Sequence, residues 1–214
     1  ESIAIVRGDG DADRVWVVVK RTINGSTKRY LERFYPTAQE FDFSTATDFC
    51  YLDCAKKITM ASGTAVSGLS HLEGAAVKVW ADGDTIESKT VASGAITLSA
   101  AATSLFVGLP YTATIQPMPL EFVLQDGTAQ GHKFNAQRMQ VLFHKSLGGQ
   151  YKSTSTGTAY SLEYPAGTTA VFSGRRDQHL KPDWVDAVTL TFLHSDPTPF
   201  NMLGYVLKSE RSKS

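Results

Sequence analysis

Apolar and polar residues alternate in the stretch VWVVVKRTINGSTKRYLERF, residues 15–34. An alternation with a period of two predicts a β-strand, because successive side chains of a strand point to opposite faces. The two alternating runs are separated by Asn24-Gly25, and Asn-Gly between such runs is the strongest short signal for a β-hairpin. The sequence therefore predicts a hairpin with a two-residue turn at these positions.

The turn fixes the register of this hairpin, since the loop length sets which residues face each other. The expected pairs are Arg21 with Lys28, Lys20 with Arg29, and Trp16 with Arg33. One face would carry Val15, Val17, Val19, Tyr30 and Phe34, interrupted by Glu32, and the other would carry Trp16, Val18 and Leu31 with Lys20, Arg29 and Arg33. We therefore expect packing on both sides near the base of the ribbon, with its basic end projecting beyond that packing.

Four cations, Lys20, Arg21, Lys28 and Arg29, gather near the predicted turn. Like charges that face each other across a strand pair cost stability, so the presence of four cations close together requires an explanation. The favoured interpretation is an exposed tip that its charges keep soluble. The alternatives are contact with acidic groups of a neighbouring subunit and contact with nucleic-acid phosphate. These four residues form the candidate site for partner or DNA contact.

The same pattern of strands and turns continues along the chain. A second hairpin is predicted in residues 75–91, with its turn at Asp82-Gly83. Further strands are predicted at Gly94–Leu98, Ser104–Leu109, Arg138–Ser146, Thr168–Gly174 and Trp184–His194. No long stretch has the period of an amphipathic helix, although residues 36–43 and 121–125 could each form a helical turn. Short strands between turn-prone spacers predict an all-β fold, with antiparallel sheets in a sandwich- or barrel-like arrangement.

Composition divides the chain into three predicted segments. The middle one, 57–108, is poor in charge and has its own hairpin, which indicates a small β module inserted in or appended to a larger domain. The first segment, 1–56, is expected to supply the first hairpin and strands of that larger domain. The third, 109–214, is expected to be a β-sandwich that completes the larger sheet. The boundary falls in the proline-rich stretch 109–121, because proline keeps neighbouring residues extended.

Global composition limits the classes of function. The chain has 214 residues, of which 42% are hydrophobic, as is typical of a folded protein. Lys plus Arg and Asp plus Glu both number 21, so the formal net charge is zero and any electrostatic function has to be local. No apolar run reaches the ~18–20 residues that span a bilayer, so no membrane span is expected. Because Glu1 opens the chain inside a predicted strand, without a methionine or the regions of a signal peptide, we expect a C-terminal fragment of a longer protein.

The two cysteines, Cys50 and Cys54, lie in the stretch FCYLDCA. In a strand both would share a face with Leu52 and lie about 13 Å apart, at ~3.3 Å per residue, which is too far for a disulfide. Two cysteines without further cysteines or close histidines are also weak support for a metal site. We therefore expect two buried free thiols in a reducing compartment, and a metal or redox pair is the less favoured alternative.

No segment carries a recognised catalytic motif: the chain has no phosphate-binding loop, no nucleophile elbow and no zinc-protease helix motif. The histidines are scattered singly, at positions 71, 132, 144, 179 and 194. The sequence thus predicts a protein that is not an enzyme, without catalytic, cofactor-binding or metal-binding residues and without a cofactor.

Two weaker patterns also favour structural interpretations. Residues 9–14, DGDADR, begin like a calcium loop, but Arg and Lys occupy the positions where that loop needs Gly and Glu. A solvated turn is therefore favoured over a weak calcium site. Asp177, Asp183 and Asp186 invite comparison with the paired carboxylates of glycosidases, yet their spacing does not fix the separation that such chemistry needs. Loop capping is favoured there, and a hydrolase is the least favoured function.

Several segments, in a fixed order, resemble a family of bacteriophage tail proteins. They are VWVVVKRTINGSTKRYLERF, YLDCA, VSGLSHLEGAAVKVWADG followed by VASGAITL, VGLPYTATIQPMPLE, and DPTPFNMLGYVLKSE. Together they extend over roughly residues 13–208 and are similar to the tail nozzle proteins of short-tailed phages and related prophages, which are also described as packaged-DNA stabilisation or tail-hub proteins. One departure is Cys54, which stands where a small residue is expected.

The resemblance implies a mostly β structural protein of the virion tail, made in the bacterial cytoplasm, whose ring surrounds the DNA exit channel. Its implied partners are tail proteins on the adaptor or portal side and toward the distal tail, further copies of itself, and DNA through non-specific contact. Zero net charge fits a conduit, because a strongly basic wall would add salt-dependent affinity for DNA. The alternative is a β-sandwich carbohydrate-binding or adhesive module, in which Trp16, Trp80, Trp184 and the eight tyrosines would supply a platform for stacking sugars.

Overall fold

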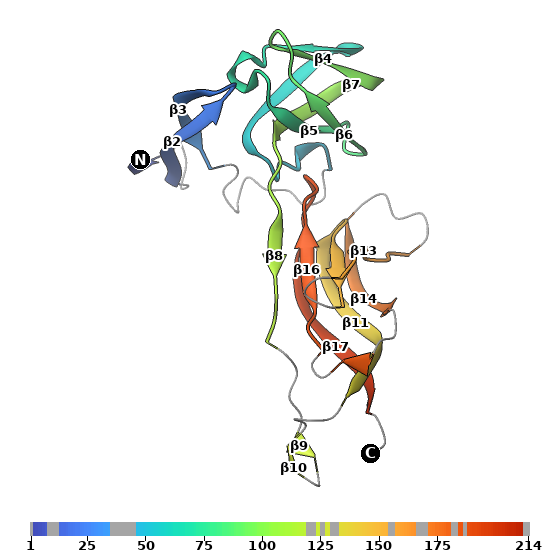
Figure 1. Cartoon of the computed structure of the whole chain (residues 1–214). Coiled ribbons are helices and arrows are strands. Elements are labelled where there is room, and N and C mark those ends of the chain that lie inside the picture. The colour runs from blue at the N-terminus through green and yellow to red at the C-terminus, as the bar shows by residue number, and fades with distance from the viewer. Residues whose placement is uncertain are drawn as a thin grey trace. The chain divides into compact units, whose positions relative to one another are not determined.

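The computed structural model consists of antiparallel β-sheets joined by turns and two short 3₁₀ helices in the residues that it describes. The described residues are 2–7, 13–34, 46–118, 123–124, 127–128, 133–153, 157–165, 171–180, 184–185 and 188–211. The prediction of an all-β fold is confirmed. The chain divides into two compact units, 1–111 and 112–214, which are described separately (Figure 1).

The first unit begins with a three-stranded sheet in the order β1 (Ser2–Arg7), β2 (Asp13–Ile23) and β3 (Ser26–Arg33). The predicted hairpin is confirmed by its register: Arg21 lies opposite Lys28, Lys20 opposite Arg29, and Trp16 opposite Arg33. Asn24 and Gly25 both have positive φ, 48° and 70°. Positive φ at both central residues is the conformation of the turn type that matches the twist of the flanking strands.

A second sheet of the first unit contains the longest of the described strands, β4 and β7 (Figure 1). Its order is β4 (Asp53–Ser67), β7 (Ala95–Leu109), β5 (Ala76–Ala81) and β6 (Thr85–Thr90). The predicted turn at Asp82-Gly83 connects β5 to β6. The Asp82 carboxylate fixes this turn to β7, because it accepts hydrogen bonds from the backbone N–H groups of Thr103 at 3.1 Å and Ser104 at 2.8 Å.

One hydrophobic cluster connects the two sheets of the first unit. Ile23, the last residue of β2, is 5% exposed and belongs to the same cluster as Leu69 and Leu72. Tyr30 packs against this cluster and donates its hydroxyl to the backbone carbonyl of His71 at 2.8 Å. The turn end of the hairpin is therefore docked, and the prediction that it projects beyond the packing is wrong. Burial of one isoleucine side chain stabilises the folded protein by roughly 1.5–3 kcal/mol. The turn end is therefore more stable packed against this cluster than exposed to solvent.

The second unit contains two four-stranded sheets and one small two-stranded sheet. The first has the order β14 (Phe172–His179), β11 (Phe134–Ser146) and β15 (Trp184–Val185), with β17 (Met202–Arg211) also paired to β11. The second has the order β13 (Tyr160–Ser161), β12 (Gln150–Lys152), β16 (Thr191–His194) and β8 (Ala113–Ile115). The small sheet pairs β9 (Val123–Leu124) with β10 (Gly127–Thr128). The hydrophobic cluster of this unit takes residues from both large sheets, including Val141 and Phe143 of β11 and Phe192 of β16. The two sheets therefore share one core, as the layers of a sandwich do.

A buried amide closes part of the second core. Gln178 of β14 is 1% exposed. Its Nε2 donates to the carbonyl of Glu163 at 2.8 Å, and its Oε1 accepts from the N–H of Glu163 at 2.7 Å. A buried amide needs such partners because burying a polar group without a hydrogen bond is costly. Gln178 thus satisfies the backbone N–H and carbonyl of Glu163, as the backbone of a neighbouring strand would.

Several predicted strands differ in extent from the observed ones. The separate predictions Gly94–Leu98 and Ser104–Leu109 form the single strand β7. Strand β4 pairs with β7 at residues 95–97 and again at residues 102–109, on either side of a register shift that contains the exposed short residues 99–101. The predicted helical turn at 121–125 is wrong at Val123–Leu124, which pair as a strand. The predicted helical turn at 36–43 lies outside the described residues.

The three predicted segments correspond only partly to the two observed units. The boundary between the units follows Tyr111, within the predicted boundary stretch 109–121. Strand β4 starts before residue 57, so the predicted small module begins too late. Segments 1–56 and 109–214 were expected to share one sheet, but the described strands of β1 to β3 pair only among themselves.

Candidate functional site

The four predicted contact residues do not form one exposed cluster. Lys20, Lys28 and Arg29 are exposed, whereas Arg21 is partly buried. All four lie behind the turn, because the pairs Thr22–Thr27 and Ile23–Ser26 stand between them and Asn24. The structure therefore leaves three of the four side chains exposed, beside the docked end of the hairpin.

Arg21 meets an acidic partner within its own hairpin. Its Nε and one terminal nitrogen donate to the two carboxylate oxygens of Glu32, each at 2.7 Å. The Asp53 carboxylate lies 3.9 Å from another nitrogen of Arg21. Hydrogen bonds with Glu32 raise the pKa of Arg21, and the same bonds lower the pKa of Glu32. This two-point geometry is the strong form of an ion pair, because both partners are charged and aligned.

Cys54 and His71 stand beside this ion pair. Burial and the neighbouring Glu32 carboxylate raise the pKa of the Cys54 thiol to about 11. Burial lowers the pKa of His71. The thiolate is the nucleophilic form of cysteine, so a thiol that holds its proton at neutral pH is unsuited to nucleophilic attack. The group formed by Arg21, Glu32, Cys54 and His71 is therefore arranged to join the hairpin to β4.

Both cysteines are free, and both are partly buried. The expectation that they share the core-facing side of one strand is wrong, because β4 begins only at Asp53 and Cys54 has a φ of 50°. Phe49 and Leu52 are the buried residues of the stretch, at 1% and 8% exposure. Burial raises the pKa of Cys50 to about 11 as well.

Large apolar side chains are exposed at the open end of the N-terminal sheet. We call its two sides the valine face, with Val15, Val17 and Val19, and the lysine face, with Trp16, Val18 and Lys20. On the valine face Ile3, Ile5 and Phe34 are 70%, 69% and 63% exposed. On the lysine face Leu31 is 69% exposed. The expected packing at the base of the ribbon is therefore absent within the described residues, whereas the turn end is packed.

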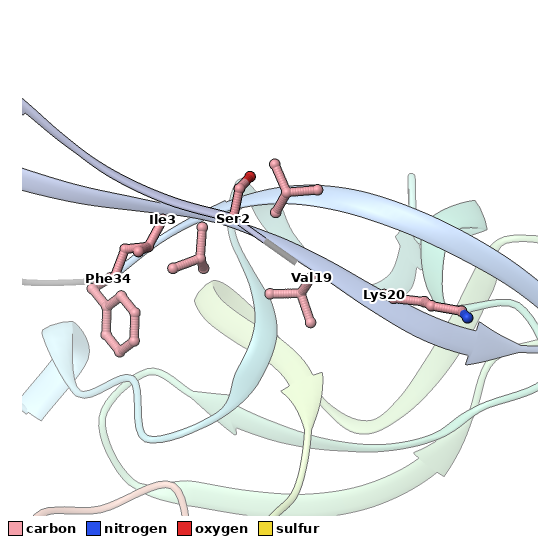
Figure 2. A pocket seen from close by; sticks show the side chains of 7 residues that line it. Ser2, Ile3, Val19, Lys20 and Phe34 are labelled. Carbon is pink, nitrogen blue, oxygen red and sulfur yellow. The ribbon is translucent and has the colours of Figure 1, made fainter.

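A shallow hollow of about 700 Å³ lies along this open end of the sheet. In Figure 2, Ile3 and Phe34 lie at one end of it and Lys20 at the other. Contiguous exposed apolar surface of this kind marks interaction sites. The sequence indicated this apolar surface, because both faces of the predicted ribbon carried apolar residues. It did not indicate which end of the ribbon would pack against a hydrophobic core.

The other predicted chemistry finds little support in the geometry. Asp177 of β14 is exposed and accepts a hydrogen bond from Gln140 at 2.9 Å. Asp183, Asp186 and most of the stretch 9–14 lie outside the described residues. His194, one of the singly scattered histidines, is buried, stacks on Phe200 at 5.1 Å between ring centroids, and contacts the carbonyl of Thr198. Within the described residues, no group of three or more metal-ligating side chains converges on one point.

One predicted sugar-stacking residue is removed from the surface. Trp80 is 1% exposed, donates its indole N–H to the carbonyl of Ala46 at 2.6 Å, and stacks on Phe49. Trp16 is partly exposed, and the side chain of Trp184 lies outside the described residues. Trp80 is therefore excluded from a sugar-stacking platform.

No protein-family model and no curated protein matches this chain. Within the described part of the chain, no helix is long and apolar enough to span a membrane.

Proposed function

We propose that this chain is a non-catalytic structural component of a bacteriophage tail, part of a nozzle or hub ring around the DNA exit channel. The observation that carries the proposal is the open end of the N-terminal sheet, where Ile3, Ile5, Leu31 and Phe34 are all more exposed than buried. A single soluble chain rarely keeps contiguous apolar surface of this kind unless a partner covers it. A subunit of a large assembly has such partners on several sides.

Two further features support a structural role. The ordered series of segments that resembles tail nozzle proteins extends over most of the chain, and the fold is all-β, as that resemblance implies. The polar group around Glu32 contains a two-point ion pair and a thiol whose pKa is raised to about 11 by burial and by the Glu32 carboxylate. Such a group contributes stability and offers no activated nucleophile.

The partners that fit this role are further copies of the chain and the neighbouring proteins of the tail. Lys20, Lys28 and Arg29 are the described cations of the predicted site that remain exposed, and we assign them to partner or DNA contact. Arg21 is left out of this assignment because Glu32 already occupies its guanidinium.

The proposal is tested by locating the protein in purified virions. Quantitative mass spectrometry is expected to find it at a fixed number of copies for each particle, and imaging of the full-length protein is expected to show rings. Absence from purified particles contradicts the proposal. Reversing the charges of Lys20, Lys28 and Arg29 together is expected to leave the protein folded and to weaken particle assembly or DNA retention.

A further inference from the structure

The turn of the first hairpin exposes both of its central residues. Asn24 and Gly25 are exposed, and an ideal Cβ placed on Gly25 would meet nothing within 4 Å. The last pair of the hairpin is Ile23 with Ser26, so the N–H of Gly25 lies inside the turn and outside the ladder of backbone hydrogen bonds. The backbone nitrogen of Gly25 is therefore open to reaction with the side chain that precedes it.

The second hairpin has the same kind of turn in a closed environment. Asp82 and Gly83 have φ values of 51° and 75°, close to the 48° and 70° of the first turn. Gly83 is buried, and a Cβ placed on it would approach the backbone nitrogen of Thr47 to 2.9 Å. The Asp82 carboxylate is fixed by backbone N–H groups of β7. The two turns thus share a backbone conformation, and only the first leaves its side chain and nitrogen open to solvent.

We propose that Asn24 is a site of spontaneous modification, at which the side-chain amide is lost and an aspartyl or isoaspartyl residue forms. The backbone nitrogen of Gly25 attacks Cγ of Asn24, the bond from Cγ to Nδ2 breaks, and Nδ2 leaves as ammonia with the proton of Gly25. A cyclic imide results. Water then adds to one of its two carbonyl carbons and opens the ring, so that one water is consumed and one ammonia is released. The modification goes beyond the tail assignment, because it needs only this turn and water.

The isoaspartyl product lengthens the main chain at the point where the hairpin is anchored. In this product the chain continues through the former side-chain carbon, which adds one atom between Ile23 and Ser26. The length of a hairpin loop fixes the register of its strands. Ile23 is 5% exposed and packs with Leu69 and Leu72, so a change of register removes it from this cluster. The isoaspartyl product therefore releases the turn end of the hairpin from the rest of the first unit.

The aspartyl product adds a charge without lengthening the chain. Asn24 borders a hollow of about 350 Å³, and Glu73 and Lys28 are among the other residues that line it. The Glu73 carboxylate accepts hydrogen bonds from the N–H groups of Ser93 at 2.9 Å and Gly94 at 2.6 Å. A carboxylate at position 24 would be repelled by Glu73 and attracted by Lys28. Because these effects oppose each other, the added main-chain atom is the change that undocks the hairpin.

The test is incubation of the full chain at mildly alkaline pH, which favours removal of the Gly25 proton, beside a sample unfolded in urea. Mass spectrometry of peptides detects the replacement of an amide by a carboxyl group, and chromatography separates aspartyl from isoaspartyl peptides. In the folded chain Asn24 is expected to react at least about ten-fold faster than Asn135 and Asn201, the other two asparagines. No isoaspartate is expected at Asp82. The proposal is overturned if Asn24 reacts only in urea, or if the three asparagines react at equal rates.

Amide hydrogen exchange tests the consequence for the hairpin. The isoaspartyl form, isolated by chromatography, is expected to exchange the N–H of Ile23 at least about ten-fold faster than the unmodified chain. Asn24→Asp supplies the charge alone and is expected to keep the protection of Ile23. Asn24→Gly has no amide to lose, and Gly-Gly suits the same turn, so its protection is expected to survive the incubation. Equal loss of protection in Asn24→Asp, or loss in incubated Asn24→Gly, would overturn the assigned consequence.

Discussion

Arg21 and Glu32 are joined by two hydrogen bonds of 2.7 Å, although the hairpin register places Lys28 opposite Arg21 and Val17 opposite Glu32. The two side chains reach each other along the valine face, past the pair formed by Val19 and Tyr30. The most buried cation of the basic cluster is therefore neutralised by a carboxylate of the adjacent strand. This arrangement explains how a hairpin tolerates like charges in facing positions.

Glu32→Gln is expected to lower the free energy of unfolding by about 1–3 kcal/mol, because it leaves a partly buried guanidinium without its counter-charge. Urea denaturation measures this change. Arg21→Lys is the control, since it keeps the positive charge but loses the two-point geometry, and its effect should be smaller than that of Glu32→Gln. Equal stability of the wild-type and Glu32→Gln proteins would contradict the role of the pair.

The contribution of Glu32 to the stability of the folded protein is expected to decrease as the pH is lowered. Its pKa is lowered in the folded protein by the hydrogen bonds from Arg21, so the stabilisation is present above the unfolded pKa of about 4.3 and is lost as pH falls through the lower, folded pKa. The stability difference between wild type and Glu32→Gln should therefore shrink as the pH is lowered below about 4. A difference that grows with acidification is the opposite result.

Cys54 and Cys50 provide an internal comparison for alkylation by iodoacetamide. Both have a pKa of about 11 from burial, but Glu32 raises only that of Cys54. Glu32→Gln is expected to lower the pKa of Cys54 and to speed its alkylation near pH 8, while the rate at Cys50 stays the same. Mass spectrometry of the two peptides measures both rates in one sample. Equal acceleration at both cysteines would indicate loosening of the whole unit.

Ile23→Ala and Leu31→Ala test which end of the hairpin is anchored. Ile23 is buried in the shared cluster, so its truncation is expected to cost about 2–4 kcal/mol of unfolding free energy. Leu31 is 69% exposed, and its truncation is expected to change stability by less than about 0.5 kcal/mol. Thermal or chemical denaturation measures the loss of stability in each variant. A larger loss in Leu31→Ala than in Ile23→Ala would mean that the base of the hairpin is the packed end.

Gln178→Met is expected to destabilise the second unit by about 1–3 kcal/mol. The substitution keeps a side chain of similar size but leaves the backbone N–H and carbonyl of Glu163 without their partners. Gln140→Met is the matched control, because Gln140 is bonded to Asp177 at an exposed position and should matter little. Amide hydrogen exchange around Glu163 should increase in Gln178→Met alone.

The hairpin was predictable in detail because its signals are local. Alternation and the Asn24-Gly25 turn are enough to fix the register, and the facing pairs follow from it. The site was less predictable, because the docking of Ile23 depends on Leu69 and Leu72, far along the chain. Glu32 was visible only as an interruption in an apolar face, and a sequence does not tell which cation such a residue meets.

The extent of strands was predicted poorly where pairing, rather than side-chain pattern, maintains them. Residues 99–101 of β7 are exposed serine and alanine residues, yet they continue a strand that β4 supports on both sides of a register shift. Cys50 and Cys54 were misplaced for a related reason, since the chain turns at Cys54 with a positive φ that alternation does not reveal.

The two hydrophobic clusters have no residue in common, one lying within 1–111 and the other within 112–214. Each unit therefore buries its own apolar surface and has its own source of cooperativity. Folding of one unit does not have to wait for the other during synthesis, when the first unit leaves the ribosome before the second is complete. This order shortens the time in which the unfinished strands of the two units are exposed to each other.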